Sequence, residues 1–314
     1  MRQFKTVITF IGFSLALIGP LTTNETGRAA EADPTPGTMF ATLRDQLNSV
    51  HMIRLRAVSR GKSPSPQDPT GAIVIENRTE TLIKNDKFLI NSQIINPALK
   101  GPVVRIHAFD GVEYQSIDEQ KGILVTNRLG TADRRAPAYF MPQPFMIMFN
   151  FALDGALNRD YPALKQAELW NRVAAKSCVT GRGSVKSIPC VVVEVDGLET
   201  GKSATLYLAE SLGYYPLKVE YRTEVFTRVD VVEEFETVAD GARSLIVPTK
   251  VSTTGVVNSS KIKSTSVLSV KTGSLEVNKP VDDIIFMLPR NQVPIHIDMT
   301  SGKAYKNGQL IVSP

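Results

Sequence analysis

Residues 103–126 read VVRIHAFDGVEYQSIDEQKGILVT, and this stretch decides the class of fold. Apolar and polar residues alternate in three short runs, which is the pattern of half-buried β-strands. Asp110-Gly111 separates the first two runs and is a strong signal for a tight hairpin. A second turn signal, at 118–122, precedes the third run. The stretch therefore predicts an antiparallel meander with one face on the core and one face in water.

The same alternation of apolar and polar residues continues on both sides of this meander. Upstream, alternation over 49–60, 72–75, 80–83 and 87–91 predicts strands, with Asn85-Asp86 as a turn. The segment Gly61–Pro69 contains three prolines, so we expect a loop there. Downstream, strands are expected over Arg172–Val179, Ile188–Val195, Ala204–Ala209, Leu217–Arg222, Thr227–Thr237, Leu245–Thr254, Lys261–Val270 and Leu275–Val277.

Helices are expected in only two parts of the chain. Thr38 is a candidate cap for a helix that runs through Leu47, and Asp160 with Pro162 can begin a second one that reaches Trp170. A third expected helix, Phe145–Leu153, lies between these two and is apolar on nearly every face. The fold class that follows is α+β: a long, curved antiparallel sheet with a few helices across it.

The first 32 residues are expected to be a secretory signal peptide. Arg2 and Lys5 precede an apolar run over 7–18, and Ala30-x-Ala32 provides small residues for cleavage before Asp33. Cleavage after Ala30 is the close alternative, and a retained N-terminal anchor is the other interpretation. The apolar run is shorter than the ~20 residues that span a bilayer. We therefore expect an exported protein with a single mature domain over 33–314 and no integral membrane segment.

Composition argues against nucleic acid as a partner. The chain has 36 basic and 31 acidic residues and a formal net charge of +5, and no run of lysine and arginine is dense enough to follow a phosphate backbone. Weak attraction to an anionic membrane surface stays open.

Two cysteines, Cys178 and Cys190, flank a Gly- and Ser-rich segment between two expected strands. In an oxidising compartment, two cysteines across a hairpin can form a disulfide if they fall in register. Such a bridge would stabilise the fold by about 3 kcal/mol. The alternative is two unpaired thiols. Two cysteines without a histidine nearby are too few to hold a metal ion.

Motifs for catalysis are incomplete in this sequence. Gly201-Lys202-Ser203 resembles part of a phosphate-binding loop, but Asp196 stands where that loop needs its first glycine. His51, His107 and His296 follow strand patterns, and no G-x-S-x-G or H-E-x-x-H occurs. We therefore expect a binding protein without a cofactor or metal. An enzyme is the third interpretation, and conservation of a polar cluster around His296 and Asp298 among homologues would favour it.

The apolar segment is the strongest candidate for a ligand site. Methionine and phenylalanine side chains suit surfaces that accept varied hydrophobic partners. An ordinary core helix is the alternative, and a curved sheet with helices across its mouth can also leave a cavity between them. The residues expected to line the cavity or its lid are Phe145, Met146, Met148, Phe149 and Leu153, with Trp170 nearby.

Several short motifs, in order, resemble one superfamily of periplasmic proteins. They are Lys87-Phe88-Leu89-Ile90, the segment Phe109–Tyr114, Gly213–Glu220, and Phe286-Met287-Leu288-Pro289-Arg290 near the C-terminus. Their arrangement is similar to that of the lipoprotein-localisation factors LolA and LolB and of RseB-like proteins. The chain departs from the pattern at Tyr114, where the family commonly has tryptophan.

The resemblance implies an unclosed half-barrel with helices across its concave face, located in the periplasm or otherwise exported by a Sec-type signal. It further implies a lipid or lipoprotein acyl chain as the ligand, as in the sorting of outer-membrane lipoproteins. An envelope sensor that uses the same fold to hold a protein partner is the alternative. No residue matches a function in handing a lipoprotein to a membrane receptor.

Overall fold

The computed structural model describes residues 34–64, 72–85, 87–128, 167–196, 202–240, 243–290 and 293–312. The expected signal peptide and the Phe145–Leu153 segment lie outside these residues. Two α-helices are described, α1 (Pro36–Asn48) and α3 (Ala167–Ala175), together with two short 3-10 turns, η4 (Glu210–Leu212) and η5 (Asp283–Phe286). Within the described part of the chain, no helix has the length and apolar character needed to cross a membrane.

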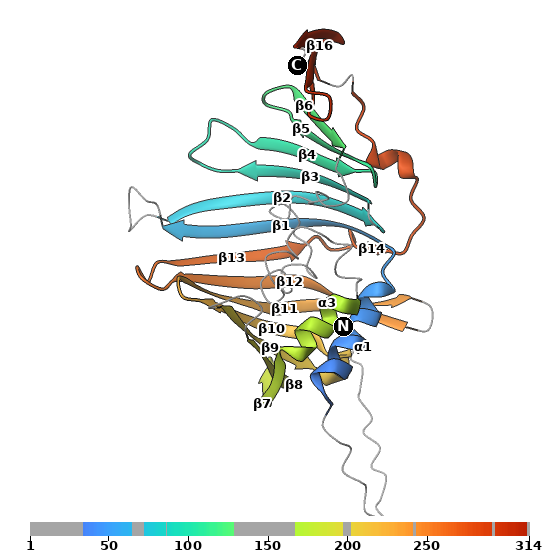
Figure 1. Ribbon diagram of the computed structural model, residues 1–314. Coiled ribbons are helices and arrows are strands. Elements are labelled where there is room, and N and C mark those ends of the chain that lie inside the picture. Colours follow the sequence, from blue (N-terminus) through green and yellow to red (C-terminus); the bar gives the residue numbers. More distant parts are fainter. Residues whose placement is uncertain are drawn as a thin grey trace, which may run out of the picture. The chain divides into compact units, whose positions relative to one another are not determined.

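Most of the remaining described residues belong to one sheet, drawn in Figure 1. Its strands are β1 (Met52–Pro64), β2 (Ala72–Lys84), β3 (Lys87–Ile95), β4 (Val103–Phe109), β5 (Glu113–Asp118), β6 (Ile123–Arg128), β7 (Ser177–Val185), β8 (Ile188–Asp196), β9 (Lys202–Ala209), β10 (Tyr215–Thr223), β11 (Phe226–Asp240), β12 (Arg243–Val257), β13 (Lys263–Val270), β14 (Glu276–Val277), β15 (Ile295–Asp298), β16 (Lys303–Lys306) and β17 (Gln309–Val312).

The sheet grows in two directions from β1. On one side, β2 to β6 follow as an antiparallel meander. The chain then resumes at β7 and returns through successive antiparallel pairs to β13. There β13 pairs with the free side of β1, with Ala57 opposite Val270. This long-range pairing joins the two halves into one sheet.

The sheet does not close into a barrel. After β14, the chain crosses to the β6 edge, where β15 adds in parallel and β16 and β17 follow. Among the described strands, β7 pairs only with β8 and β17 pairs only with β16, so both edges stay open. This is the expected curved, unclosed antiparallel sheet.

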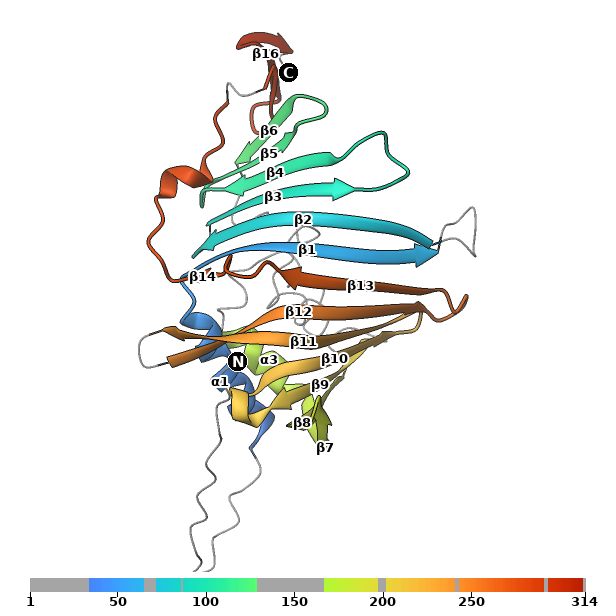
Figure 2. The same cartoon turned by 180° about the vertical axis from the view of Figure 1, so that it is seen from behind.

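The two faces of the sheet have different neighbours. We call the face that carries Ile53, Leu55 and Ala57 the inner face, because these side chains form one buried apolar cluster with residues of α1 and α3. Both helices lie in front of the strands in Figure 1 and behind them in Figure 2, so they cover the same side of the sheet. Alternate side chains, which include Arg54 and Arg56, point to the opposite, outer face.

A segment that we call the strap, residues 281–290, crosses the outer face. Phe286 is fully buried against Met52 and Leu82. Further along, the Leu288 amide donates a hydrogen bond to the Gln115 side chain, and Arg290 pairs with a carboxylate of β5. These contacts carry the chain from the middle of the sheet to the edge where β15 begins.

The sequence predicted most elements, with three corrections. α1 begins at Pro36 because the Thr35 hydroxyl accepts a hydrogen bond from the Thr38 amide, which makes Thr35 the cap. Residues 61–64, expected in a loop, extend β1, since a proline is tolerated at the end of a strand. Residues 172–175, expected in a strand, belong to α3, where Val173 is buried one turn after Trp170.

The predicted disulfide is wrong: Cys178 and Cys190 are both free, the first exposed and the second buried. In the β7–β8 hairpin, Cys178 lies opposite Glu194, while Cys190 lies opposite Gly183. The two cysteines are thus offset by four residues along β8, which is about 13 Å and too far for a disulfide. The turn of this hairpin lies at Lys186 and Ser187, much closer to Cys190 than to Cys178, and the bulge between Val179 and Gly181 shifts the register by only one residue.

Candidate functional site

The inner face of β1 to β5 is arranged in rows that run across the strands. The first row is apolar: it joins Ile53, Ile83, Phe88, Phe109 and Tyr114, each directly opposite the next. The Phe88 ring centroid lies 5.9 Å from that of Phe109 and 6.4 Å from that of Tyr114. These separations are typical of packed aromatic pairs, so this end of the floor is a rigid aromatic surface.

The next two rows become steadily more polar. The second row is Leu55, Thr81, Ile90, His107 and Ser116. The third is Ala57, Thr79, Ser92, Arg105 and Asp118. Over two steps along the strands, the floor therefore changes from aromatic and aliphatic to hydroxyl-bearing and charged. We refer to these three rows as the amphipathic floor.

The polar members of the floor are buried rather than solvated. Thr79, Thr81, Ser92 and His107 are each 5% exposed or less. Ser92 donates to a backbone carbonyl, but Thr81 Oγ1 finds no hydrogen-bond partner among the described residues. A buried hydroxyl without a partner costs about 1–3 kcal/mol, so such positions call for an explanation.

His107 lies in the middle row of the floor, between Ile90 and Ser116. Its Nδ1 lies 2.6 Å from the Tyr114 hydroxyl. Burial lowers the pKa of His107 from 6.5 to about 4, and the nearby positive charge of Arg105 acts in the same direction. The imidazole is therefore neutral at neutral pH and serves as a hydrogen-bonding group. Burial also raises the pKa of Tyr114, so its hydroxyl keeps its proton.

The inner face of the other half of the sheet holds a buried ion pair. Arg228 Nε lies 2.8 Å from Asp230 Oδ2, and the Thr253 hydroxyl also donates to this carboxylate. Asp230 is 1% exposed, and burial raises the pKa of its carboxyl despite the opposing effect of Arg228 and Thr253. Val232 and Val251 next to it are buried too.

Trp170 is the one predicted ligand-site residue within the described part of the chain. It lies in α3 with 1% exposure, and its ring centroid is 6.0 Å from that of Phe40 in α1. Both side chains belong to the apolar cluster that includes the aromatic row of the floor. The other predicted residues, Phe145, Met146, Met148, Phe149 and Leu153, lie outside the described residues, so their role stays a prediction.

The sequence did not identify the amphipathic floor as a site. The alternation in β2 to β5 predicted which residues share a face, but the rows depend on the register between strands, which only the pairing fixes. Of the three histidines, His107 is buried, His51 is exposed and His296 is half-buried. β9 begins at Lys202, so no helix follows the glycine and lysine that resemble a phosphate-binding loop. The described residues contain no cluster of histidine, cysteine and acidic side chains that could hold a metal ion.

No protein-family model and no curated protein matches the chain. Solved structures do match it. One is a DUF1329 family protein from Desulfovibrio piger, at 14% identity and a TM-score of 0.44; the match covers 81% of this chain and 98% of that chain. Another is an uncharacterized conserved protein from Thermus thermophilus, at 8% identity, 82% and 97% coverage and a TM-score of 0.31.

A third is the MucA/MucB complex of Pseudomonas aeruginosa, at 11% identity, 77% and 99% coverage and a TM-score of 0.22. The strand pairings of this chain make one open, mostly antiparallel sheet with helices on its inner face.

Proposed function

We propose that this protein is an exported binding protein of the cell envelope that holds an amphiphilic ligand, such as a lipid acyl chain with its polar end group, against its inner face. It acts by burial and release rather than by making bonds. The observation that supports this proposal is the amphipathic floor, whose rows change from Phe88 and Phe109 to Ser92 and Arg105 within about 14 Å of strand.

The gradient matches the two parts of such a ligand. Burial of apolar surface contributes about 25 cal/mol per Å², so an acyl chain over the aromatic row gains affinity from the hydrophobic effect alone. A carboxylate or phosphate at the other end would lie in the third row, beside the planar guanidinium of Arg105, where it would compete with Asp118 opposite it on β5. Thr81 and His107 lie between the aromatic row and Arg105, and their polar side chains can form hydrogen bonds with a ligand, whereas a purely apolar core would have no such groups.

The test is a native mass spectrum after mild purification, followed by solvent extraction and lipid analysis. We expect a co-purifying mass that is extracted as a lipid, and binding of a fluorescent fatty acid by the emptied protein. Arg105→Gln should weaken binding of the fatty acid about ten-fold and leave binding of the corresponding uncharged alcohol unchanged. Absence of lipid together with absence of fatty-acid binding would rule out the proposal.

A protein partner is the second candidate function. A peptide segment also combines apolar side chains with groups that form hydrogen bonds, and the buried hydroxyls of Thr79, Thr81 and Ser92 could serve its amides. Phe149→Glu, in the predicted apolar segment, separates the two functions. If it abolishes capture of a defined envelope protein while lipid content is unchanged, the peptide alternative is correct.

A further inference from the structure

The outer face carries a separate pocket at the C-terminal edge of the sheet. It has a volume of about 800 Å³ and lies between the end of the strap and the β15–β16 hairpin. Eight residues line it: Arg290, Val293, Pro294, His296, Asp298, Tyr305, Asn307 and Gly308. Its volume is in the range of small-molecule sites. Because it lies on the face opposite the amphipathic floor, it is independent of the function proposed above.

The aromatic part of the pocket is held in place by the sheet. His296 and Tyr305 lie opposite each other on neighbouring strands, with ring centroids 5.6 Å apart and planes inclined by 18°. On its other side, His296 Nε2 is 2.9 Å from the hydroxyl of Thr126 in β6. The stacked pair therefore has a fixed orientation before any ligand arrives.

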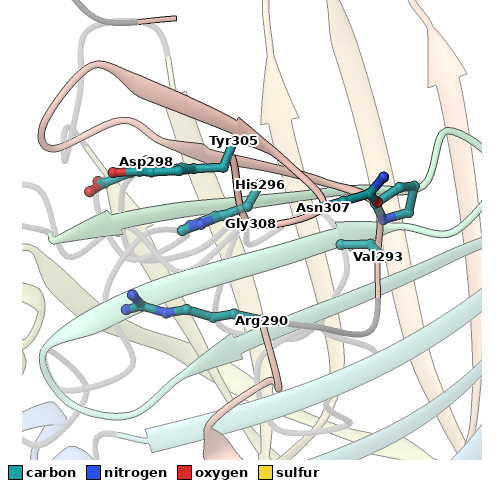
Figure 3. Close-up of a pocket in the computed structure, with 8 residues that line it drawn as sticks. Arg290, Val293, His296, Asp298, Tyr305, Asn307 and Gly308 are labelled. Atoms are coloured by element: carbon teal, nitrogen blue, oxygen red, sulfur yellow. The ribbon is translucent and has the colours of Figure 1, made fainter. Parts of the chain in front are cut away.

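The two charged groups are also oriented in advance. Arg290 Nη2 is 3.2 Å from Glu113, which tethers the strap over β5. The Asp298 carboxylate accepts hydrogen bonds from the Thr300 and Ser301 amides and from the Ser301 hydroxyl. Figure 3 shows the side chains of Arg290, His296 and Asp298 extending in the same direction.

The charged side chains at the pocket balance one another, so no excess charge is left to bind an ionic ligand. Arg290 is compensated by Glu113, and Asp298 adds a further negative charge to the rim. The pocket instead contains planar groups that donate or accept hydrogen bonds. These are the side chains of its arginine, aspartate, histidine and asparagine, and the hydroxyl of Tyr305 adds a further donor and acceptor. Val293, Pro294 and the aromatic pair add apolar flanks.

We propose that this outer-face pocket binds a saccharide unit. A neutral sugar ring has several hydroxyls that both donate and accept, and a face of C–H groups that packs against an aromatic ring. An anion would meet the carboxylates of Glu113 and Asp298, and a cation would meet Arg290. A neutral polyhydroxylated ring forms hydrogen bonds with the planar groups and is repelled neither by the carboxylates nor by Arg290.

The test uses saturation-transfer NMR and calorimetry on the full mature chain, with maltose and N,N′-diacetylchitobiose as first probes and a glycan array as a broader panel. We expect ring C–H signals from at least one saccharide. Tyr305→Leu and Arg290→Gln should each weaken its binding at least ten-fold. Tyr305→Phe, which keeps the ring, should weaken it less than Tyr305→Leu.

Ile311→Ala is the matched control, because Ile311 is exposed on the adjacent β17, is not the residue opposite Tyr305 and does not line the pocket. Thermal melting followed by circular dichroism shows whether each variant folds. If Tyr305→Leu does not fold, Arg290→Gln still tests the proposal, because Arg290 is exposed and its substitution should not affect folding. The proposal is overturned if no saccharide in the panel binds. It is also overturned if binding is insensitive to Arg290→Gln, or if phosphate or acetate binds there instead. Because the readout is sugar binding, its failure is distinct from a failure of fatty-acid binding.

Discussion

Acidification should destabilise this protein through one buried histidine. His107 is 5% exposed in the amphipathic floor, and its pKa lies at about 4, compared with 6.5 for the ordinary side chain. The unfolded chain therefore takes up a proton as the pH falls through 6.5, and the folded chain does not. The free energy of unfolding therefore decreases as the pH falls from 6.5 to about 4. The stability that the neutral His107 side chain contributes is fully present only above this pH range.

The size of the effect follows from the difference in pKa. A decrease from 6.5 to about 4 corresponds to about 3 kcal/mol of unfolding free energy. His107→Asn keeps a hydrogen-bonding group near Nδ1 but cannot take up this proton. The variant should be less stable than wild type at pH 7, and the gap between the two should narrow by about 3 kcal/mol at pH 4.

Urea unfolding followed by circular dichroism at pH 7, 6, 5 and 4 measures the gap, and NMR titration of the imidazole protons measures the pKa itself. His51→Asn, at an exposed position, controls for the loss of a histidine. A gap that narrows by less than about 1 kcal/mol, or a His107 resonance that titrates near pH 6.5, would refute the reasoning.

Three further predictions concern the inner face, the strap and the cysteines. In urea unfolding, Asp230→Ala should destabilise the fold by about 3–5 kcal/mol, because it leaves a largely buried Arg228 without its carboxylate. The double variant Arg228→Met with Asp230→Leu should recover most of this loss. An Asp230→Ala variant as stable as wild type would contradict this. Phe286→Ala should cost about 3–5 kcal/mol in the same assay, and a cost below 1 kcal/mol would mean that the strap is not anchored there. In a thiol-labelling assay of the native protein, Cys178 should react quickly and Cys190 only after denaturation, and a protein without titratable thiols would contradict the free cysteines.

Local patterns predicted the elements of this fold well. Alternation identified the meander strands, and turn residues marked their boundaries: Asp110 caps the following amides through its side chain, and Gly111 has a φ of 98°. Asn85 likewise adopts a positive φ of 53° in the β2–β3 turn. These features depend on neighbours in the sequence, which is why the sequence alone reveals them.

What the sequence could not predict depends on register and long-range pairing. The disulfide failed because the hairpin turns at Lys186 and Ser187, which places Cys178 much further from the turn than Cys190. The pairing of β1 with β13 joins residues about 200 positions apart, and the parallel addition of β15 to β6 follows only after the strap has crossed the sheet. The amphipathic floor arises from five strands in register, so it has no signature within any one of them.

The central claim, that the inner face holds a lipid-like ligand, is tested most directly through Trp170. It is the only tryptophan in the chain and belongs to the large apolar cluster that also includes the aromatic row of the floor, so intrinsic fluorescence reports from one position within this cluster. The measurement is quenching by a fatty acid brominated along its chain. We predict saturable quenching that an unbrominated fatty acid reverses by competition. Emission that stays unchanged through the titration, with no competition, would contradict it.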